Sequence, residues 1–124
     1  MQKLIWIGSA GMVGAILRTS IGHLVGEGSS FPITFTANMV ATWLLCFFAA
    51  GVLAKIIHNP QIREAITVGF LGSFSTFSAL SMETVLLIEN GQIVTAVSYV
   101  LASVIGGIAV GLFGFHCGRK LVSP

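Results

Sequence analysis

Apolar residues run through this sequence in long stretches that short polar connections separate. The stretches cover residues 4–25, 32–57, 61–89 with an interruption near 73–76, and 92–117, and residues 26–30 form the first connection. A helix needs about 20 residues to cross the hydrocarbon core of a membrane, and every stretch reaches that length. The pattern therefore predicts an all-α membrane protein, in which residues 1–124 form a single domain of four transmembrane helices.

The composition agrees with this prediction and narrows the function. Charged residues make up 8% of the chain and hydrophobic residues 55%, whereas a soluble domain carries about 25% charged residues. The sequence has no histidine pair at metal-binding spacing, no phosphate loop and no Ser-His-Asp set that could converge. We therefore expect neither an enzyme nor a nucleic-acid-binding protein. Because so small a chain hardly encloses a pathway alone, we expect an oligomer.

The third stretch contains an unusually polar segment, from Gly69 to Glu83. Glycines, serines, a threonine and a carboxylate occur there, and glycine weakens a helix interior by about 1 kcal/mol relative to alanine. Backbone that breaks a helix at membrane depth is tolerated only where protein buries it or where it lines a cavity. Ser75 and Thr76 fall near the centre of this stretch, so we expect two half-helices to meet there, at the midplane of the membrane.

A polar stripe marks the second stretch, where Thr34, Asn38 and Thr42 recur at four-residue intervals on one helix face. Asn38 is the informative member, because a lone amide in hydrocarbon needs hydrogen-bond partners. Two interpretations remain open for it. Asn38 either holds neighbouring helices together or lines a pathway as a hydrogen-bond donor.

The second and third stretches together offer a narrow polar track, which consists of Thr34, Asn38, Phe77, Ser78 and Ser81. Its amide and hydroxyl donors carry no full charge. Such donors suit a small anion that must exchange its water shell. The alternative is that they only form hydrogen bonds with one another inside the helix bundle. The edge of a phenylalanine ring is electropositive, so Phe77 can stabilise an anion without binding it as tightly as arginine would. Passage requires binding strong enough for entry and weak enough for release.

Arg18 is the charged residue of the first stretch. Because a charge at the bilayer centre costs at least about 2.5 kcal/mol, Arg18 is expected near an end of the span or beside a partner. It serves either as an anchor or packing salt bridge, or in a direct role with an anion. No A-x-A cleavage site follows this stretch, so we expect it to be retained rather than removed as a signal peptide.

Glycines recur at helical spacing in the first and last stretches. Gly14 and Gly22 share a face with Arg18, and the last stretch contains Gly107-x3-Gly111 and Gly114-x3-Gly118. Small residues allow a neighbouring backbone to approach closely. We therefore expect both stretches to pack through these glycines.

The positive charges indicate the orientation of the chain. All lysines and arginines except Arg18 fall on the side that both termini share with the second connection: Lys3, Lys55, Arg63, Arg119 and Lys120. Connections rich in lysine and arginine face the cytoplasm. We expect a multi-pass protein of a bacterial plasma membrane with both termini in the cytoplasm.

Three motifs resemble the CrcB/Fluc fluoride channels, and the match spans all four stretches. The motifs are Gly11-x2-Gly14-x3-Arg18, Thr34-x3-Asn38, and the run from Gly72 to Ser78 with Glu83 beyond it. Members of this family are small four-helix proteins that pair as antiparallel dimers, of the dual-topology type, with two fluoride pores. The resemblance implies a fluoride-selective channel that exports fluoride passively and lowers its cytoplasmic concentration.

The resemblance also implies roles for particular residues. Asn38 and Phe77 would line a pore. A structural sodium ion would lie at the dimer interface, held by backbone carbonyls of the broken helix, which by position in the motif belong to Gly72 and Ser75. A cation between two facing breaks would satisfy carbonyls that an interrupted helix leaves unpaired.

The chain departs from the family pattern at the second pore phenylalanine. Leu80 stands there, and Ala79 replaces a hydroxyl residue. Leucine has no electropositive edge, so one pore station is weakened or lost. An antiparallel homodimer also requires one chain to insert both ways, which one-sided positive charge disfavours. We hypothesise one half of a heterodimeric pair, with an oppositely oriented homologue that supplies the aromatic group; a homodimer is the alternative.

Two other functions remain open. A small drug/proton antiporter is another antiparallel four-helix class, and its coupling needs a carboxylate inside the membrane. The first stretch has none, and Glu83 is the candidate within a span. A non-conducting subunit that only supports its partner would tolerate Asn38→Asp or Phe77→Ile.

Overall fold

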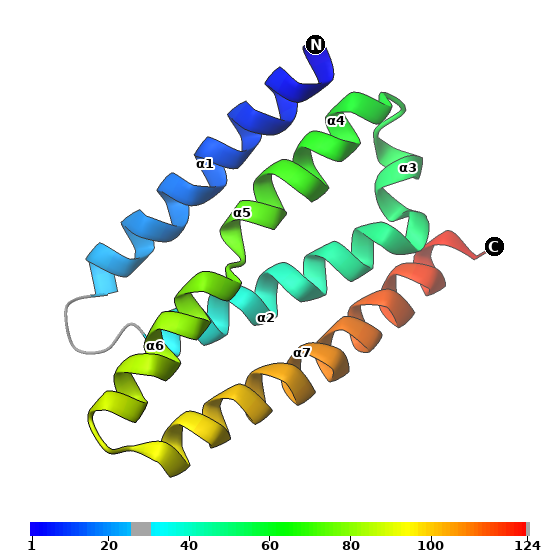
Figure 1. Ribbon diagram of the computed structural model, residues 1–124. Helices are drawn as coiled ribbons and strands as arrows, with labels where there is room; N and C mark the ends of the chain where they lie inside the picture. The colour runs from blue at the N-terminus through cyan, green and yellow to red at the C-terminus, as the bar shows by residue number, and fades with distance from the viewer. Residues whose placement is uncertain (26–30, 124) are drawn as a thin grey trace.

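The computed structural model describes residues 1–25 and 31–123, so the first connection lies outside the described residues. The described chain consists of helices joined by short connections (Figure 1). In chain order these are α1 (Gln2–Val25), α2 (Phe31–Phe47), the π-helical turn η1 (Phe48–Val52), α3 (Leu53–Ile56), α4 (Pro60–Glu64), the π-helical segment η2 (Ala65–Leu71), α5 (Gly72–Phe74), α6 (Phe77–Glu89) and α7 (Ile93–Val122).

The expectation of four membrane-spanning helices is confirmed by length and composition. The apolar spans are Gln2–Leu24, Pro32–Ile56, Pro60–Glu89 and Ile93–Val122, with mean hydropathies between 1.4 and 2.2. Large apolar side chains are exposed along all four spans, as expected for helices in lipid. The chain is thus an all-helical, multi-pass membrane protein.

Glycines allow α7 to pack directly on α2. A Cβ atom added to Gly114 would lie 2.5 Å from the Trp43 carbonyl oxygen, and one added to Gly118 would lie 2.5 Å from that of Phe47. Gly111 faces Cys46 in the same way, at 3.2 Å from its sulfur. The two helices run side by side in the same direction (Figure 1). The close packing was predicted from the glycine spacing, whereas the partner helix and its direction were not.

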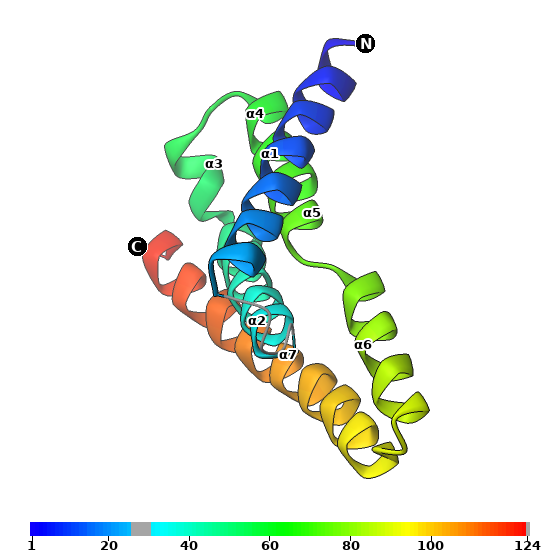
Figure 2. The same ribbon diagram turned by 90° about the vertical axis from the view of Figure 1, so that its left-hand side faces the viewer.

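Helix α1 packs mainly on the first half of the third span. A Cβ atom on Gly14 would lie 2.5 Å from the Phe70 carbonyl oxygen, whereas one on Gly22 would meet nothing within 4 Å. Figure 2 shows the reason, because the chain changes course between α5 and α6, so that α6 runs away from α1 towards its connecting turn with α7. The prediction that Gly14 and Gly22 both pack is therefore confirmed for Gly14 and wrong for Gly22.

The second span kinks before it ends. Gly51 has φ 105° and ψ −2°, a left-handed conformation that residues with a Cβ atom rarely adopt. After the kink, Lys55 in α3 donates hydrogen bonds from Nζ to the carbonyl oxygens of Leu121 (3.3 Å) and Val122 (2.8 Å). Lys3 and Glu64 form an ion pair at the same end of the molecule, with a 2.6 Å separation.

Candidate functional site

The helical path of the third span is interrupted at two residues. Helix α5 ends at Phe74 and α6 begins at Phe77, while Ser75 (φ −81°, ψ 146°) and Thr76 (φ −149°, ψ 125°) have extended backbone. Extended residues do not continue the hydrogen bonds between residues four apart. Polar backbone groups are therefore released in a segment of otherwise apolar helix.

The side chain of Asn38 holds this interruption from α2. Its amide nitrogen donates to the Thr76 carbonyl oxygen (3.2 Å), and its amide oxygen accepts from the Thr76 N–H (2.8 Å). In a continuous helix the Thr76 N–H would donate to the carbonyl of Gly72, four residues earlier. Asn38 takes that donor, so the Gly72 carbonyl loses its helical partner.

Ser73 holds the other side of the interruption, against α1. Its hydroxyl oxygen lies 2.7 Å from the Gly11 carbonyl oxygen and 2.9 Å from that of Gly69. The Phe70 carbonyl oxygen lies 3.2 Å away, and a hydroxyl has one hydrogen to donate, so the three carbonyls share it. Asn38 and Ser73 thus fix the extended residues to both neighbouring helices.

A hydrogen-bonded group of three side chains lies beyond the interruption. Thr34 in α2 donates to one carboxylate oxygen of Glu83 (2.7 Å), and the Tyr99 hydroxyl in α7 donates to the other (2.6 Å). Thr34 and Tyr99 are buried and Glu83 is half-buried. Both oxygens of an intramembrane carboxylate are therefore satisfied by hydroxyl donors from the two neighbouring helices.

Sequence reasoning placed Thr34 in the polar track but missed this group. Glu83 entered only as a possible proton carrier, and Tyr99 was not predicted as a site residue. A carboxylate within a span almost always has a partner in the bundle. That rule, applied to Glu83, would have pointed to hydroxyl-bearing residues on neighbouring helices.

The other residues of the predicted track follow the interruption on α6. The Phe77 side chain is 79% exposed, whereas Leu80 is 8% exposed. The Ser78 hydroxyl lies 2.8 Å from that of Thr76, and Ser81 donates to the Phe77 carbonyl within its own helix (3.0 Å). Phe77 and Leu80 therefore face different surroundings, one open and one packed.

Arg18 lies apart from these residues, beside a cavity of about 440 Å³ between α1 and α2. Mostly apolar side chains line this cavity, and Phe74 closes it on the side of the interruption. Within residues 1–25 and 31–123, the Nε atom of Arg18 is buried without a hydrogen-bond partner. The only ion pair in these residues joins Lys3 and Glu64. The predicted salt bridge of Arg18 is thus not formed within the described chain.

No group of three His, Cys, Asp or Glu side chains that could hold a metal occurs in the part of the chain that the structure describes. The oxygens near the interruption that could hold a metal ion are backbone carbonyls and the hydroxyl groups of Ser73, Thr76 and Ser78. Gly72 is exposed and Ser75 is half-buried. The carbonyl of Gly72, which lacks its helical donor, is the oxygen that suits such an ion by its chemistry.

The comparison with known proteins places the chain in a family. Residues 5–115 match the family described as CrcB-like protein, Camphor Resistance (CrcB). A protein of Desulfitobacterium hafniense named Fluoride-specific ion channel FluC 1 is 39% identical over 111 residues, which cover 89% of this chain and 97% of that protein. Fluoride-specific ion channel FluC 2 of Listeria innocua is 32% identical over 118 residues, which cover 95% and 92%. Fluoride-specific ion channel FluC of Nautilia profundicola is 35% identical over 117 residues, which cover 92% and 91%. The chain therefore belongs to the CrcB-like family.

Proposed function

We propose that this chain forms a fluoride-selective ion channel, which exports fluoride passively and lowers its concentration in the bacterial cytoplasm. The observation that carries the proposal is the similarity, along nearly the whole chain, to proteins named fluoride-specific ion channels. Such export needs no energy source. Hydrogen fluoride that enters from acid surroundings dissociates inside the cell, and the trapped anion leaves down its gradient.

The proposed pathway follows the polar track, with Thr34, Asn38, Phe77, Ser78 and Ser81. The exposed ring of Phe77 supports this pathway, because its edge is free to face an ion. Hydroxyl and amide donors beside it replace water around the anion and carry no full charge, so release stays fast. Leu80, at the usual position of a second aromatic group, is buried and offers no electropositive edge.

We propose that the channel is an antiparallel pair of subunits with the interruptions at the midplane of the membrane. The support is the open surface around Ser75 and Thr76, where Gly72, Phe77 and Met82 are exposed. Interrupted backbone at membrane depth must be covered by protein or line a cavity. An inverted second subunit would cover this surface and bring the two interruptions face to face.

The partner of this chain is proposed to be an oppositely oriented homologue, with the homodimer as the alternative. The lysines and arginines other than Arg18 lie near those ends of the spans that both termini and the second connection share, which favours a fixed orientation with both termini in the cytoplasm. Expression of this chain alone in a fluoride-sensitive bacterium, with reporters fused to its C-terminus, distinguishes the two. Reporter activity on the cytoplasmic side alone supports the heterodimer. Equal activity on both sides together with full rescue supports the homodimer.

We also propose a structural sodium ion between the paired interruptions, held by the backbone carbonyls of Gly72 and Ser75. The loss of the Thr76 N–H donor to Asn38 leaves the Gly72 oxygen available for a cation. A sodium ion would satisfy these oxygens and hold the two subunits together. Unfolding of the purified pair in sodium against N-methylglucamine tests this. A higher unfolding temperature in sodium is expected, and equal temperatures would remove the ion from the account.

A further inference from the structure

A cluster of positive side chains lies where α3 meets the end of α7. We call Lys55, Arg119 and Lys120 the basic rim. The Lys55 amine is bound to the carbonyls of Leu121 and Val122, which fixes it within about one helical turn of Arg119 and Lys120. Both of these side chains are exposed in the last turn of α7. The hydrogen bonds of Lys55 thus hold its ammonium group beside the last turn of α7, which carries the other two cations.

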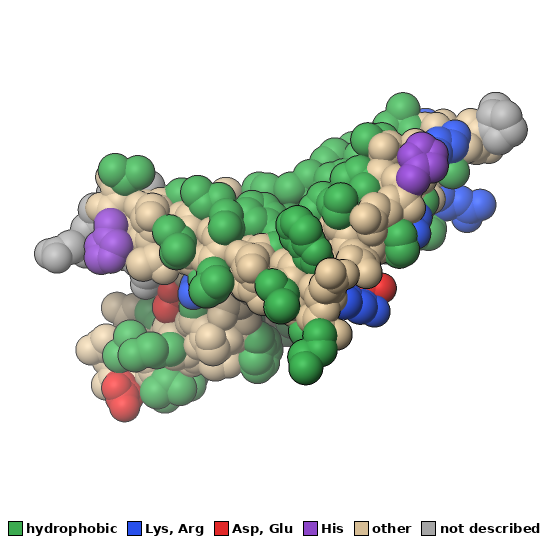
Figure 3. All heavy atoms as spheres, turned by 90° about the horizontal axis from the view of Figure 1, so that it is seen from above, with side chains coloured by type: hydrophobic (Ala, Val, Ile, Leu, Met, Phe, Trp, Pro, Cys, Tyr) green, Lys and Arg blue, Asp and Glu red, His purple; other side chains and the backbone are tan. Residues whose placement is uncertain are grey.

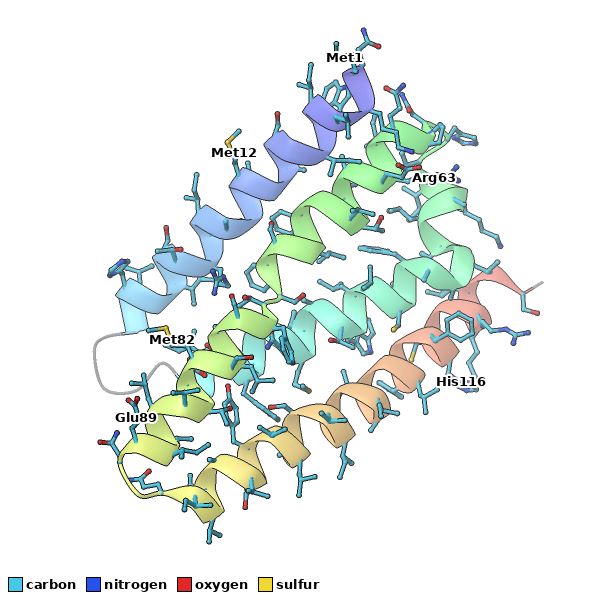
Figure 4. The ribbon with its side chains drawn as sticks, viewed as in Figure 1. Met1, Met12, Arg63, Met82, Glu89 and His116 are labelled. Carbon is cyan, nitrogen blue, oxygen red and sulfur yellow. The ribbon has the colours of Figure 1, made fainter. Side chains whose placement is uncertain are left out.

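No carboxylate of the described chain neutralises the basic rim. Glu64 is paired with Lys3, and both oxygens of Glu83 accept hydrogen bonds from hydroxyl groups. Glu89 lies at the turn between α6 and α7, at the far end of the molecule (Figure 4). In the space-filling view, lysine and arginine side chains gather mainly at the end that carries the C-terminus (Figure 3). Among the carboxylate side chains of residues 1–25 and 31–123, none therefore compensates the positive charge of the rim.

The length of α7 points to the depth of lipid headgroups for the rim. Helix α7 has 30 residues, so it is about 45 Å long and exceeds the hydrocarbon core by about 15 Å. Apolar side chains flank the cations at the same level, since Ile56 is 68% exposed and Leu121 is 63% exposed. Positive charge beside an apolar surface matches a phosphate group that is attached to an acyl chain.

We propose that the basic rim binds the phosphate headgroup of an anionic phospholipid, whose acyl chain lies against Ile56 and Leu121. The lipid neutralises the exposed cations and holds this end of the bundle in one leaflet. Lysine and arginine near a membrane surface are attracted to anionic lipids in this way. The binding is independent of the proposed function, because it needs a membrane location but no ion conduction.

The experiment is a native mass spectrometry titration of the purified full chain with phosphatidylglycerol and with phosphatidylcholine. We expect tighter binding of phosphatidylglycerol. Arg119→Gln with Lys120→Gln should weaken that binding by about fivefold for each lost charge and leave phosphatidylcholine unchanged. The charge-conserving exchange Arg119→Lys with Lys120→Arg should bind as the original chain does, which shows that the surface itself is intact.

A matched control removes the same charge elsewhere at this end, with Lys3→Gln and Arg63→Gln. This control should retain the preference for phosphatidylglycerol. Equal binding of the two lipids by the original chain would overturn the proposal, as would equal losses in the rim and control variants. Displacement of the lipid by inorganic phosphate at equal concentration would also overturn it, because a site for free phosphate needs no acyl chain.

Discussion

Replacement of Asn38 by alanine tests how the interruption is maintained. The substitution removes two hydrogen bonds, of 2.8 and 3.2 Å, between the side chain and the Thr76 backbone. A hydrogen bond contributes about 1 kcal/mol net, so the loss amounts to about 2 kcal/mol. The Thr76 N–H is then left without its side-chain acceptor, and the extended residues lose the hydrogen bonds that fix them to α2.

Two assays follow this change at the residues concerned. Hydrogen exchange at the Thr76 amide should accelerate about fivefold, which is the equilibrium equivalent of about 1 kcal/mol for the one bond that its N–H donates. Fluoride efflux from liposomes that contain the variant should fall, because the extended residues no longer hold their positions. Asn38→Asp tests the two bonds separately. The carboxylate still accepts a hydrogen bond from the Thr76 N–H, but its second oxygen cannot donate to the Thr76 carbonyl, so that bond is lost. The variant should keep the amide protected and still lose efflux.

Thr36→Ala is the matched control on the same helix. The Thr36 hydroxyl donates to the Pro32 carbonyl within α2 (2.7 Å) and does not reach the interruption. This variant should leave both exchange and efflux unchanged. The reasoning is refuted if Asn38→Ala also leaves them unchanged, or if Thr36→Ala alters both to the same degree.

Three further substitutions test the packing, the carboxylate and the pathway. Gly114→Ala brings a Cβ atom to 2.5 Å from the Trp43 carbonyl oxygen and should lower the unfolding free energy in detergent by about 1–3 kcal/mol; Gly22→Ala, with open space around it, should not. Glu83→Gln replaces one acceptor oxygen by a donor and should reduce fluoride efflux only partly, whereas complete loss of transport would favour an antiporter. Phe77→Ile removes an exposed ring edge, so efflux should be lost at an unchanged unfolding temperature; retained efflux would favour a non-conducting subunit.

The sequence predicted the spans well because hydrocarbon imposes a simple rule on every residue of a span. Helix length and the absence of charge were enough to find four helices. The kink at Gly51 was not predicted, because a glycine in an apolar run is equally typical of a packing contact. Only its φ of 105° distinguishes the two.

Regular spacing was a weaker guide to what a helix face contacts. Thr34, Asn38 and Thr42 form one stripe, yet Thr34 binds Glu83, Asn38 binds Thr76, and the methyl group of Thr42 would lie 3.4 Å from a Cβ atom on Gly111. The stripe therefore faces two different helices. Spacing identifies residues on one face, but it does not specify how far each neighbouring helix extends.

The track residues were singled out correctly as polar groups, but their hydrogen-bond partners could not be read from the sequence. Asn38 was expected to act either between helices or along a pathway. In the structure its amide forms two hydrogen bonds with Thr76, which agrees with a role between helices. A role along a pathway stays a prediction. The partners depend on the tertiary contact between α2 and the interruption, for which local sequence carries no signal.

Fluoride efflux from liposomes is the decisive measurement for a fluoride-selective channel. The purified chain is reconstituted alone and together with an oppositely inserting homologue from the same cell, and efflux is recorded with an ion-selective electrode, with chloride as the control ion. The account predicts rapid fluoride efflux without chloride efflux in at least one of the two preparations. Fluoride efflux no faster than from empty liposomes in both preparations, or equal passage of chloride, would contradict it.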